Sequence, residues 1–282
     1  MNPTEIFDGL SLPHNQNIEL KTLLSAPLAG IWAEFPEFTP WTRDETGPLL
    51  SLYPRSARLE QVQIMGLNPS YTAGDRGKTD YPVEFTSHPY FRRIGKFGQQ
   101  VSDRHQQLFQ EPAYLSSQQL YHFGELDWGH LDLLYMRTTS QSALEKQVWN
   151  TPGAASFVWK QLQLTKRLLA ALQPVAIVIA NRFGQRLTGF HKDSQTNENE
   201  WMGLQFTTRP DELGAYRITG STTNRQPDPD YAFGLAGTPV YFTSSFAGTH
   251  PRSAEADKLL INQLAETCLR EGDRYFEKYH LK

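Results

Sequence analysis

Two turns carry the side chains of this chain that are best suited to chemistry. The first is Gly66-Leu67-Asn68-Pro69-Ser70, and the second is Gly248-Thr249-His250-Pro251-Arg252-Ser253. The Asn68 carboxamide can hold and orient a polar group by hydrogen bonds, but it cannot take up a proton. The His250 imidazole can donate a hydrogen bond, and its charge changes near neutral pH. We therefore predict a pocket formed by the loops around Asn68 and His250.

Four short apolar runs predict the strands that position these turns. They lie at Val62–Met65, Leu131–Met136, Val175–Ala180 and Val240–Thr243. The first run ends at Pro69, which cannot continue strand pairing. The run at Val175–Ala180 is continuous, which is typical of a parallel strand covered on both faces. Parallel sheets bind ligands outside the carboxyl ends of their strands, so the loops after the first and fourth strands matter most.

Segments whose apolar residues recur at helical spacing separate these four runs. Apolar residues from Phe91 to Val101 recur at the period of a helix, and a long helix fits Ala155–Leu172. Ser253 can cap a closing helix whose first turn carries Glu255 and Asp257. We therefore expect the α/β fold class, with a three-layer α/β/α arrangement around a central, mostly parallel four-stranded sheet.

We expect one domain over residues 1–282 with two additions to this sheet. Residues 1–58 are rich in proline and aromatic residues, with a short helical stretch near Ile18–Leu24, and form an N-terminal extension that wraps the core. Residues 191–237 are polar and partly β-like, at Gly203–Thr207 and Ala215–Thr219. They predict an inserted hairpin or flap.

The composition excludes several classes of protein. A net charge of −3 gives no overall field toward nucleic acid, so a polyanion has to engage a local basic patch. The single Cys268 excludes an intramolecular disulfide and an iron–sulfur cluster. There is no signal peptide, no apolar run that could span a bilayer, no paired His ligands at metal spacing and no phosphate loop with Lys. We expect a cytoplasmic monomer without metal, cofactor or membrane contact.

Several segments, taken in order, resemble one known family. Residues 66–70 are similar to a Gly-hydrophobic-Asn-Pro-Gly motif that follows a first core strand, although Ser70 stands at the last glycine. The run from Phe85 to Ile94 (FTSHPYFRRI) is similar to a Phe, His-Pro and Arg-Phe-Trp stretch. Leu133–Thr139, residues 175–184 and His250-Pro251 follow in the same order. The family is the uracil-DNA glycosylase superfamily, and the mismatch-specific thymine/uracil and single-strand-selective branches are the most similar.

The resemblance implies hydrolysis of the N-glycosidic bond of uracil or a related deaminated base, as in base excision DNA repair. In that family the asparagine of the first motif positions a water, so the resemblance implies this role for Asn68. The His of the last motif donates a hydrogen bond to the base. The resemblance indicates His250 for this role, with Ser244 or Ser245 at the motif position as the alternative. An aromatic side chain stacks on the base, which indicates Phe85, with Tyr71 and Tyr81 as alternatives and core packing as another explanation.

The resemblance also implies which residues contact the DNA, in single-stranded or mismatched form. Asn68 and His250 are the candidate catalytic residues. The candidate base-binding residues are Gly66, Leu67, Pro69, Ser70, Tyr71, Phe85 and Asn181, although Asn181 can equally serve as a turn or helix cap. The candidate backbone-binding residues are Arg92, Arg93, Thr249, Arg252 and Ser253.

Two other functions remain open from the sequence. The net negative charge, Ser70 and the long insertion favour a non-catalytic or repurposed member of the family that binds a nucleobase, nucleotide or protein in the same cleft. A more distant alternative is a hydrolase that uses Ser244 or Ser245 as the nucleophile.

Overall fold

The described chain alternates strands and helices. The structure is a computed structural model that describes residues 18–41, 43–44, 47–48, 56–67, 89–110, 126–136, 140–190, 201–223, 226–227, 234–246 and 252–280. Its elements are β1 (Ile18–Glu19), α1 (Leu20–Glu34), η1 (Pro36–Trp41), β2 (Arg43–Asp44), β3 (Gly47–Pro48), β4 (Ser56–Ala57), β5 (Val62–Gly66), α2 (Pro89–Gln110), β6 (Trp128–Asp132), α4 (Gln141–Asn150), α5 (Ala154–Leu172), β7 (Ala176–Ala180), α6 (Arg182–Thr188), β8 (Leu204–Phe206), β9 (Tyr216–Thr223), β10 (Gln226–Pro227), β11 (Pro239–Thr243) and α7 (Ala254–His280). The α/β class is confirmed.

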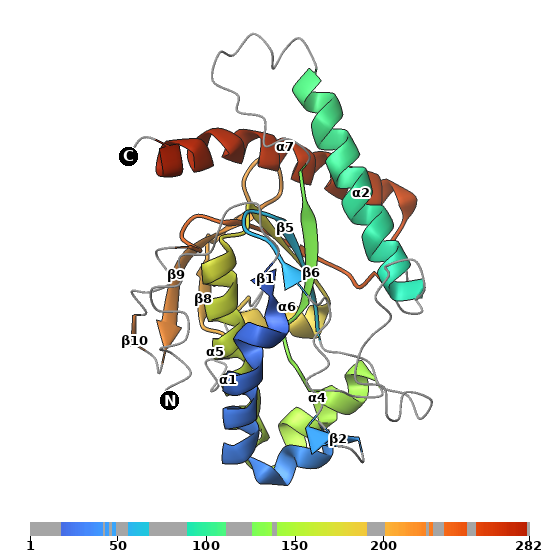
Figure 1. The fold of residues 1–282 in the computed structure, drawn as a ribbon. Helices are drawn as coiled ribbons and strands as arrows, with labels where there is room; N and C mark the ends of the chain where they lie inside the picture. The colour runs from blue at the N-terminus through green and yellow to red at the C-terminus, as the bar shows by residue number, and fades with distance from the viewer. Residues whose placement is uncertain are drawn as a thin grey trace.

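The centre of the fold is a parallel sheet of four strands in the order β11, β7, β5, β6. Figure 1 labels two of these strands, β5 and β6, which lie side by side. β5, β7 and β11 match the predicted strands to within one residue at either end. β7 is buried along its whole length between β5 and β11. A continuous apolar run therefore marked the central strand correctly, because both of its faces are covered.

The whole sheet is larger and more mixed than the predicted four strands. The hairpin of β8 and β9 comes from the insertion, and β9 pairs antiparallel with the outer edge of β11, while β10 pairs with β9. Together they make a seven-stranded mixed sheet among the described residues. The insertion thus satisfies backbone groups that β11 would otherwise expose at an edge. The predicted hairpin is confirmed in the part of the insertion that the structure describes.

The second core strand lies earlier in the chain than predicted. β6 pairs with β5 from Val62 opposite Trp128 to Gly66 opposite Asp132, whereas the prediction was Leu131–Met136. The run from Leu133 to Met136 is buried but lies beyond the sheet. The prediction was wrong because an apolar run reports burial, and here the buried segment continues past the end of the strand.

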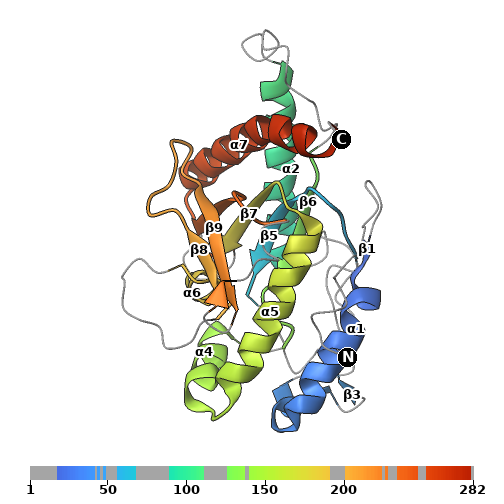
Figure 2. The ribbon, with the colours of Figure 1, turned by 90° about the vertical axis from the view of Figure 1, so that its left-hand side faces the viewer.

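The sheet separates two hydrophobic cores, which gives the three layers. On one face α2 and α7 pack against Ile64 and Val178, and on the other α1 and α5 pack against Met65 and Ile177 (Figure 2). Successive side chains of a strand point to opposite faces, so neighbouring residues enter different cores. None of the helices in the described ranges has a stretch long and apolar enough to cross a membrane.

The N-terminal helix is longer than the predicted stretch near Ile18–Leu24. α1 has 15 residues, and Leu24, Leu28 and Ile31 are buried in the core that it shares with α5. Its interior contains Pro27, a residue type that usually interrupts helical patterns. Packing of the apolar face of α1 against the core offsets the free-energy cost of a proline within the helix. This part of the predicted extension therefore belongs to a core layer.

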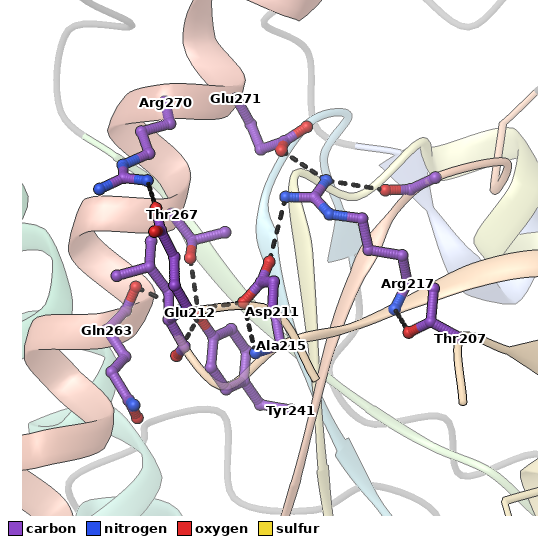
Figure 3. A network of polar contacts seen from close by, with 12 residues as sticks. Thr207, Asp211, Glu212, Ala215, Arg217, Tyr241, Gln263, Thr267, Arg270 and Glu271 are labelled. Atoms are coloured by element: carbon purple, nitrogen blue, oxygen red, sulfur yellow. Dashed lines mark hydrogen bonds and ion pairs between the residues drawn. The ribbon is translucent and has the colours of Figure 1, made fainter. Parts of the chain in front are cut away.

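Polar contacts fasten the insertion to both helical layers. On the α5 side, the buried Lys166 ammonium donates to Ser221 Oγ, the Thr222 carbonyl and Thr223 Oγ1, each at 3.0 Å. On the α7 side, Arg217 binds Glu271 (Figure 3). Buried polar groups that find such partners specify one arrangement of the elements. The hairpin therefore forms an integral part of the sheet.

The Arg217 guanidinium connects β9 with α7. It donates to Glu271 Oε1 at 2.6 Å and to the Gly237 carbonyl at 3.1 Å, and it pairs with Asp211 Oδ2 at 3.3 Å (Figure 3). The Glu271 side chain is only 7% exposed. A carboxylate in such a position needs its cationic partner, because burying a charge without one costs several kcal/mol.

We expect Arg217→Met to lower the free energy of unfolding by about 2 kcal/mol in urea denaturation, since it removes the cation beside Glu271. Arg270→Met is the matched control. Arg270 lies on α7 next to Glu271 and pairs with Glu212 and Glu266, but its side chain is 48% exposed. Its loss is expected to cost less than about 1 kcal/mol. Equal losses in the two variants would contradict the assigned role of Arg217.

Candidate functional site

The carboxyl ends of the parallel strands meet at one edge of the sheet. Gly66, Asp132, Ala180 and Thr243 are the last residues of β5, β6, β7 and β11, and all four strands run in the same direction. Only β7 separates β5 from β11, so these two strands lie about 10 Å apart. The turns that follow the first and fourth core strands therefore start from the same edge, as predicted.

A polar cluster occupies this edge around Gly66. Gly66 pairs with Asp132, and its neighbour two residues earlier, Ile64, pairs with His130. A Cβ added to Gly66 would lie 2.2 Å from Asp132 Oδ1, 2.8 Å from His130 Nε2 and 3.1 Å from the Tyr90 hydroxyl. Real Cβ atoms essentially never make contacts as short as the first two, and the third is tighter than most real contacts. The absence of a side chain at Gly66 thus provides the space in which the three polar groups gather.

The polar cluster is defined as Tyr90, His130 and Asp132. The distances between its polar atoms are at or beyond the upper limit for a hydrogen bond. His130 Nε2 lies 3.8 Å from Asp132 Oδ1 and 3.5 Å from the Tyr90 hydroxyl. The rings of Tyr90 and Phe91, both on α2, meet the imidazole edge-on, with centroids 5.8 and 5.5 Å away. Among the described residues, no group forms a hydrogen bond with His130 Nδ1. The cluster thus holds its imidazole by packing, with hydrogen-bonding capacity left over.

Burial favours the neutral forms of His130 and Asp132. It lowers the pKa of His130 to about 3 and raises the pKa of Asp132 to about 8. In each case the cause is desolvation, which disfavours the charged form. The protonated carboxylic acid is therefore the favoured form of Asp132 at pH 7, and it can donate a hydrogen bond or a proton. Strongly shifted acids at the binding edge of a sheet are candidates for general acid catalysis.

Asn181 caps the helix that follows β7. Its Oδ1 accepts hydrogen bonds from the backbone N–H groups of Phe183 at 2.8 Å and Gly184 at 3.1 Å, and its Nδ2 donates to Gln141 Oε1 at 2.7 Å. The capping role that the sequence also allowed is confirmed. These bonds account for the acceptor of the carboxamide, and its predicted contact with a base edge stays a prediction.

The candidate backbone-binding residues divide between two helices. Arg92 and Arg93 are exposed on α2, and Arg93 Nη1 donates to the Phe246 carbonyl at 3.1 Å, which ties α2 to the turn after β11. Ser253 caps α7 as predicted, because its Oγ accepts a hydrogen bond from Ala256 N at 3.1 Å. Both helices therefore reach the segment that follows β11.

The Arg252 side chain is buried, whereas a contact with solvent-exposed phosphates calls for an exposed side chain. Its side chain is 6% exposed, pairs with Asp257 and donates to Thr243 Oγ1 at 2.6 Å. Its guanidinium also lies 4.4 Å from the Phe246 ring centroid and 5.2 Å from that of Phe97. These contacts give Arg252 a structural role in joining the end of β11 to the first turn of α7, and a contact with a DNA backbone stays a prediction.

Several predicted site residues lie outside the described residues. They are Asn68, Pro69, Ser70, Tyr71, Phe85, Thr249 and His250, together with the alternative Tyr81. Of the other candidates, Leu67 is buried directly after β5. Ser244 is exposed after β11, and no residue in the described ranges hydrogen-bonds to it. Ser245 is half-buried, and the role of Ser244 or Ser245 as a nucleophile stays a prediction.

Within the described ranges, no three His, Cys, Asp or Glu side chains gather as they would around a metal ion. No model of a protein family, no curated protein and no solved structure compared with the chain matches it. The polar cluster is therefore the strongest chemical feature of this edge.

None of the three residues of this cluster was among the candidates predicted from the sequence. A signal was present, because His130 and Asp132 alternate with apolar residues in the segment Gly-His-Leu-Asp, as polar residues on one face of a strand do. The predicted strand began at Leu131 and so excluded His130. The pairing of Asp132 with Gly66 depends on the register of β6 against β5, which the sequence does not show.

Proposed function

We propose that this protein is a metal-independent glycosylase that hydrolyses the N-glycosidic bond of uracil or a related deaminated base in DNA. The observation that carries the proposal is the buried Asp132 carboxyl, which lies against Gly66 at the carboxyl edge of the sheet and whose pKa is raised by burial. Asn68 is two residues from Gly66, so covalent geometry limits their Cα separation to about 7 Å. A water-orienting amide and a proton-donating acid are thus both available at the same strand end.

The two groups have complementary roles in the proposed reaction. Asn68 holds a water against the sugar carbon, whose bond to the base breaks as the bond to the water oxygen forms. Negative charge builds on the departing base, and the Asp132 carboxyl donates its proton there. The water loses a proton to solvent, and Asp132 regains one from solvent. His250 is the proposed second hydrogen-bond donor to the base, in accordance with the sequence motif.

The polar cluster suits Asp132 to this role. A general acid works best when its pKa lies near the working pH, and burial places the pKa of Asp132 at about 8. Burial also keeps His130 neutral, so it brings no positive charge that would favour ionisation of Asp132. The acid consequently stays protonated until a base with developing charge is present.

The direct test is release of uracil from single-stranded and U:G-mismatched oligonucleotides in the presence of EDTA, detected as alkali-sensitive strand cleavage. We expect release by the wild type and a rate about 10²-fold lower for Asn68→Ala, because the water loses its positioning group. No release by the wild type from either substrate would sink the proposal. Tight binding of free uracil or abasic DNA without turnover would instead support the non-catalytic alternative.

A further inference from the structure

A groove of about 670 Å³ lies between α2 and α7. Its lining includes Ser245 and Phe246, shortly after the end of β11, so it reaches the carboxyl edge of the sheet. On α2 it extends from Arg93 to Gln107, which corresponds to about 21 Å of helix. The groove therefore leads away from the candidate site along one face of the molecule.

The charge of this groove is opposite to that of the whole protein. The described residues that line it include five basic and two acidic side chains, whereas the chain has a net charge of −3. The basic residues are Arg93, Lys96, Arg104, Arg252 and Lys258, and the acidic ones are Asp103 and Asp257. Five minus two leaves an excess of three positive charges in the groove. Such a local excess attracts a polyanion even when the overall field does not.

The acidic side chains of the groove are engaged within the protein. Asp257 pairs with Arg252, and Asp103 accepts a hydrogen bond from Gln99 Nε2 at 2.9 Å. Lys96 and Lys258, in contrast, are exposed, one on each wall. The ammonium groups available to a ligand therefore come from both sides of the groove.

The walls of the groove are held by contacts that need no ligand. Arg104 Nε on α2 donates to Asn262 Oδ1 on α7 at 2.8 Å. At the other end, Arg93 binds the Phe246 carbonyl, and the Arg252 guanidinium lies over the Phe246 ring. A preformed groove loses little conformational entropy when a ligand binds.

We propose that the groove binds the phosphate backbone of a single nucleic-acid strand, with Lys96 and Lys258 as its principal phosphate contacts. The choice of a nucleic acid over an acidic peptide rests on the proposed function, because the groove opens beside the edge where the base would bind. The buried Phe97 and Phe246 rings are covered by Arg252, so recognition depends on phosphate charge and is independent of base sequence.

The test is fluorescence anisotropy with a labelled, uracil-free thymidine 20-mer at several salt concentrations. For the double variant Lys96→Gln/Lys258→Gln we expect about tenfold weaker binding at 0.1 M salt. The slope of log K against log salt concentration should fall in magnitude by about 1.4, since each lost phosphate contact with a single strand contributes about 0.7. The control is Lys21→Gln/Lys146→Gln, which removes the same charge from exposed positions on α1 and α4 and should bind like the wild type.

The outcomes separate this inference from the proposed function. If the Lys96/Lys258 variant binds with the wild-type slope, the groove inference is overturned, whether or not the wild type releases uracil. If the variant loses binding as expected while the wild type releases no uracil, the groove inference stands and the proposed function fails. Displacement of the 20-mer by polyglutamate at equal charge concentration would identify an acidic peptide as the ligand and overturn the choice of nucleic acid.

Discussion

Replacing Asp132 by Asn is expected to slow uracil release by about 10²–10⁴-fold, the usual contribution of a general acid. Asn has the same shape and still donates a hydrogen bond, but it cannot supply the proton that the departing base takes up. The matched control is Asp127→Asn. Asp127 lies just before β6, at the opposite edge of the sheet, where its half-exposed carboxylate pairs with Arg58, and its replacement should leave the rate unchanged.

The pH profile gives this prediction a second readout. Burial raises the pKa of Asp132 to about 8, so the wild-type rate should fall about tenfold per pH unit above pH 8, as the acid ionises. The residual rate of Asp132→Asn should show no such fall. A variant with the wild-type rate and the wild-type profile would contradict the assignment of Asp132 as the acid.

Stability should depend on pH through the same group. The pKa of Asp132 rises from 3.8 to about 8 on folding, so its neutral form is favoured in the native state. The associated stability is fully present below pH 3.8 and is lost as the pH rises to about 8. The stability of the wild type relative to Asp132→Asn should therefore fall between pH 4 and pH 9, by an amount on the order of 5 kcal/mol. Urea denaturation at a series of pH values measures this difference.

Replacing Gly66 by Ala should have the second large effect. The new Cβ would meet Asp132, His130 and Tyr90 at distances that force these side chains to move. We expect the free energy of unfolding to fall by about 3 kcal/mol, as for other overpacked sites, and base release to be lost because the acid is displaced. Urea denaturation and the base-release assay measure the two effects.

Gly30→Ala is the control for Gly66→Ala. Gly30 lies in α1, and a Cβ added there meets no atom within 4 Å, so alanine should stabilise the helix by about 0.5–1 kcal/mol. Combining Gly66→Ala with Asp132→Ala should cost less than the sum of the two single changes, because the second removes the nearest clashing atom. Wild-type stability of Gly66→Ala, or strict additivity in the double variant, would refute the packing described around Gly66.

The fold was predictable wherever one element's own pattern decides its structure. Helical spacing from Phe91 to Val101 predicted the first half of α2, and the apolar run Val175–Ala180 predicted β7. Ser253 predicted the start of α7, because a cap acts only on its own first turn. These signals are local and survive without knowledge of neighbouring elements. The boundaries of β6 and the length of α1 were not predictable in this way, since packing against other elements determines both.

By itself, the sequence determined the order of strands and helices, the central strand, and the two turns that begin at the carboxyl edge of the sheet. The tertiary structure alone decided that Gly66 lies opposite Asp132 with His130 and Tyr90 beside them, and that α2 and α7 bring Lys96 and Lys258 into one groove. The physical reason is that strand register and helix packing join residues far apart in the chain. The pKa of Asp132 likewise arises from burial, which is a property of the assembled neighbours.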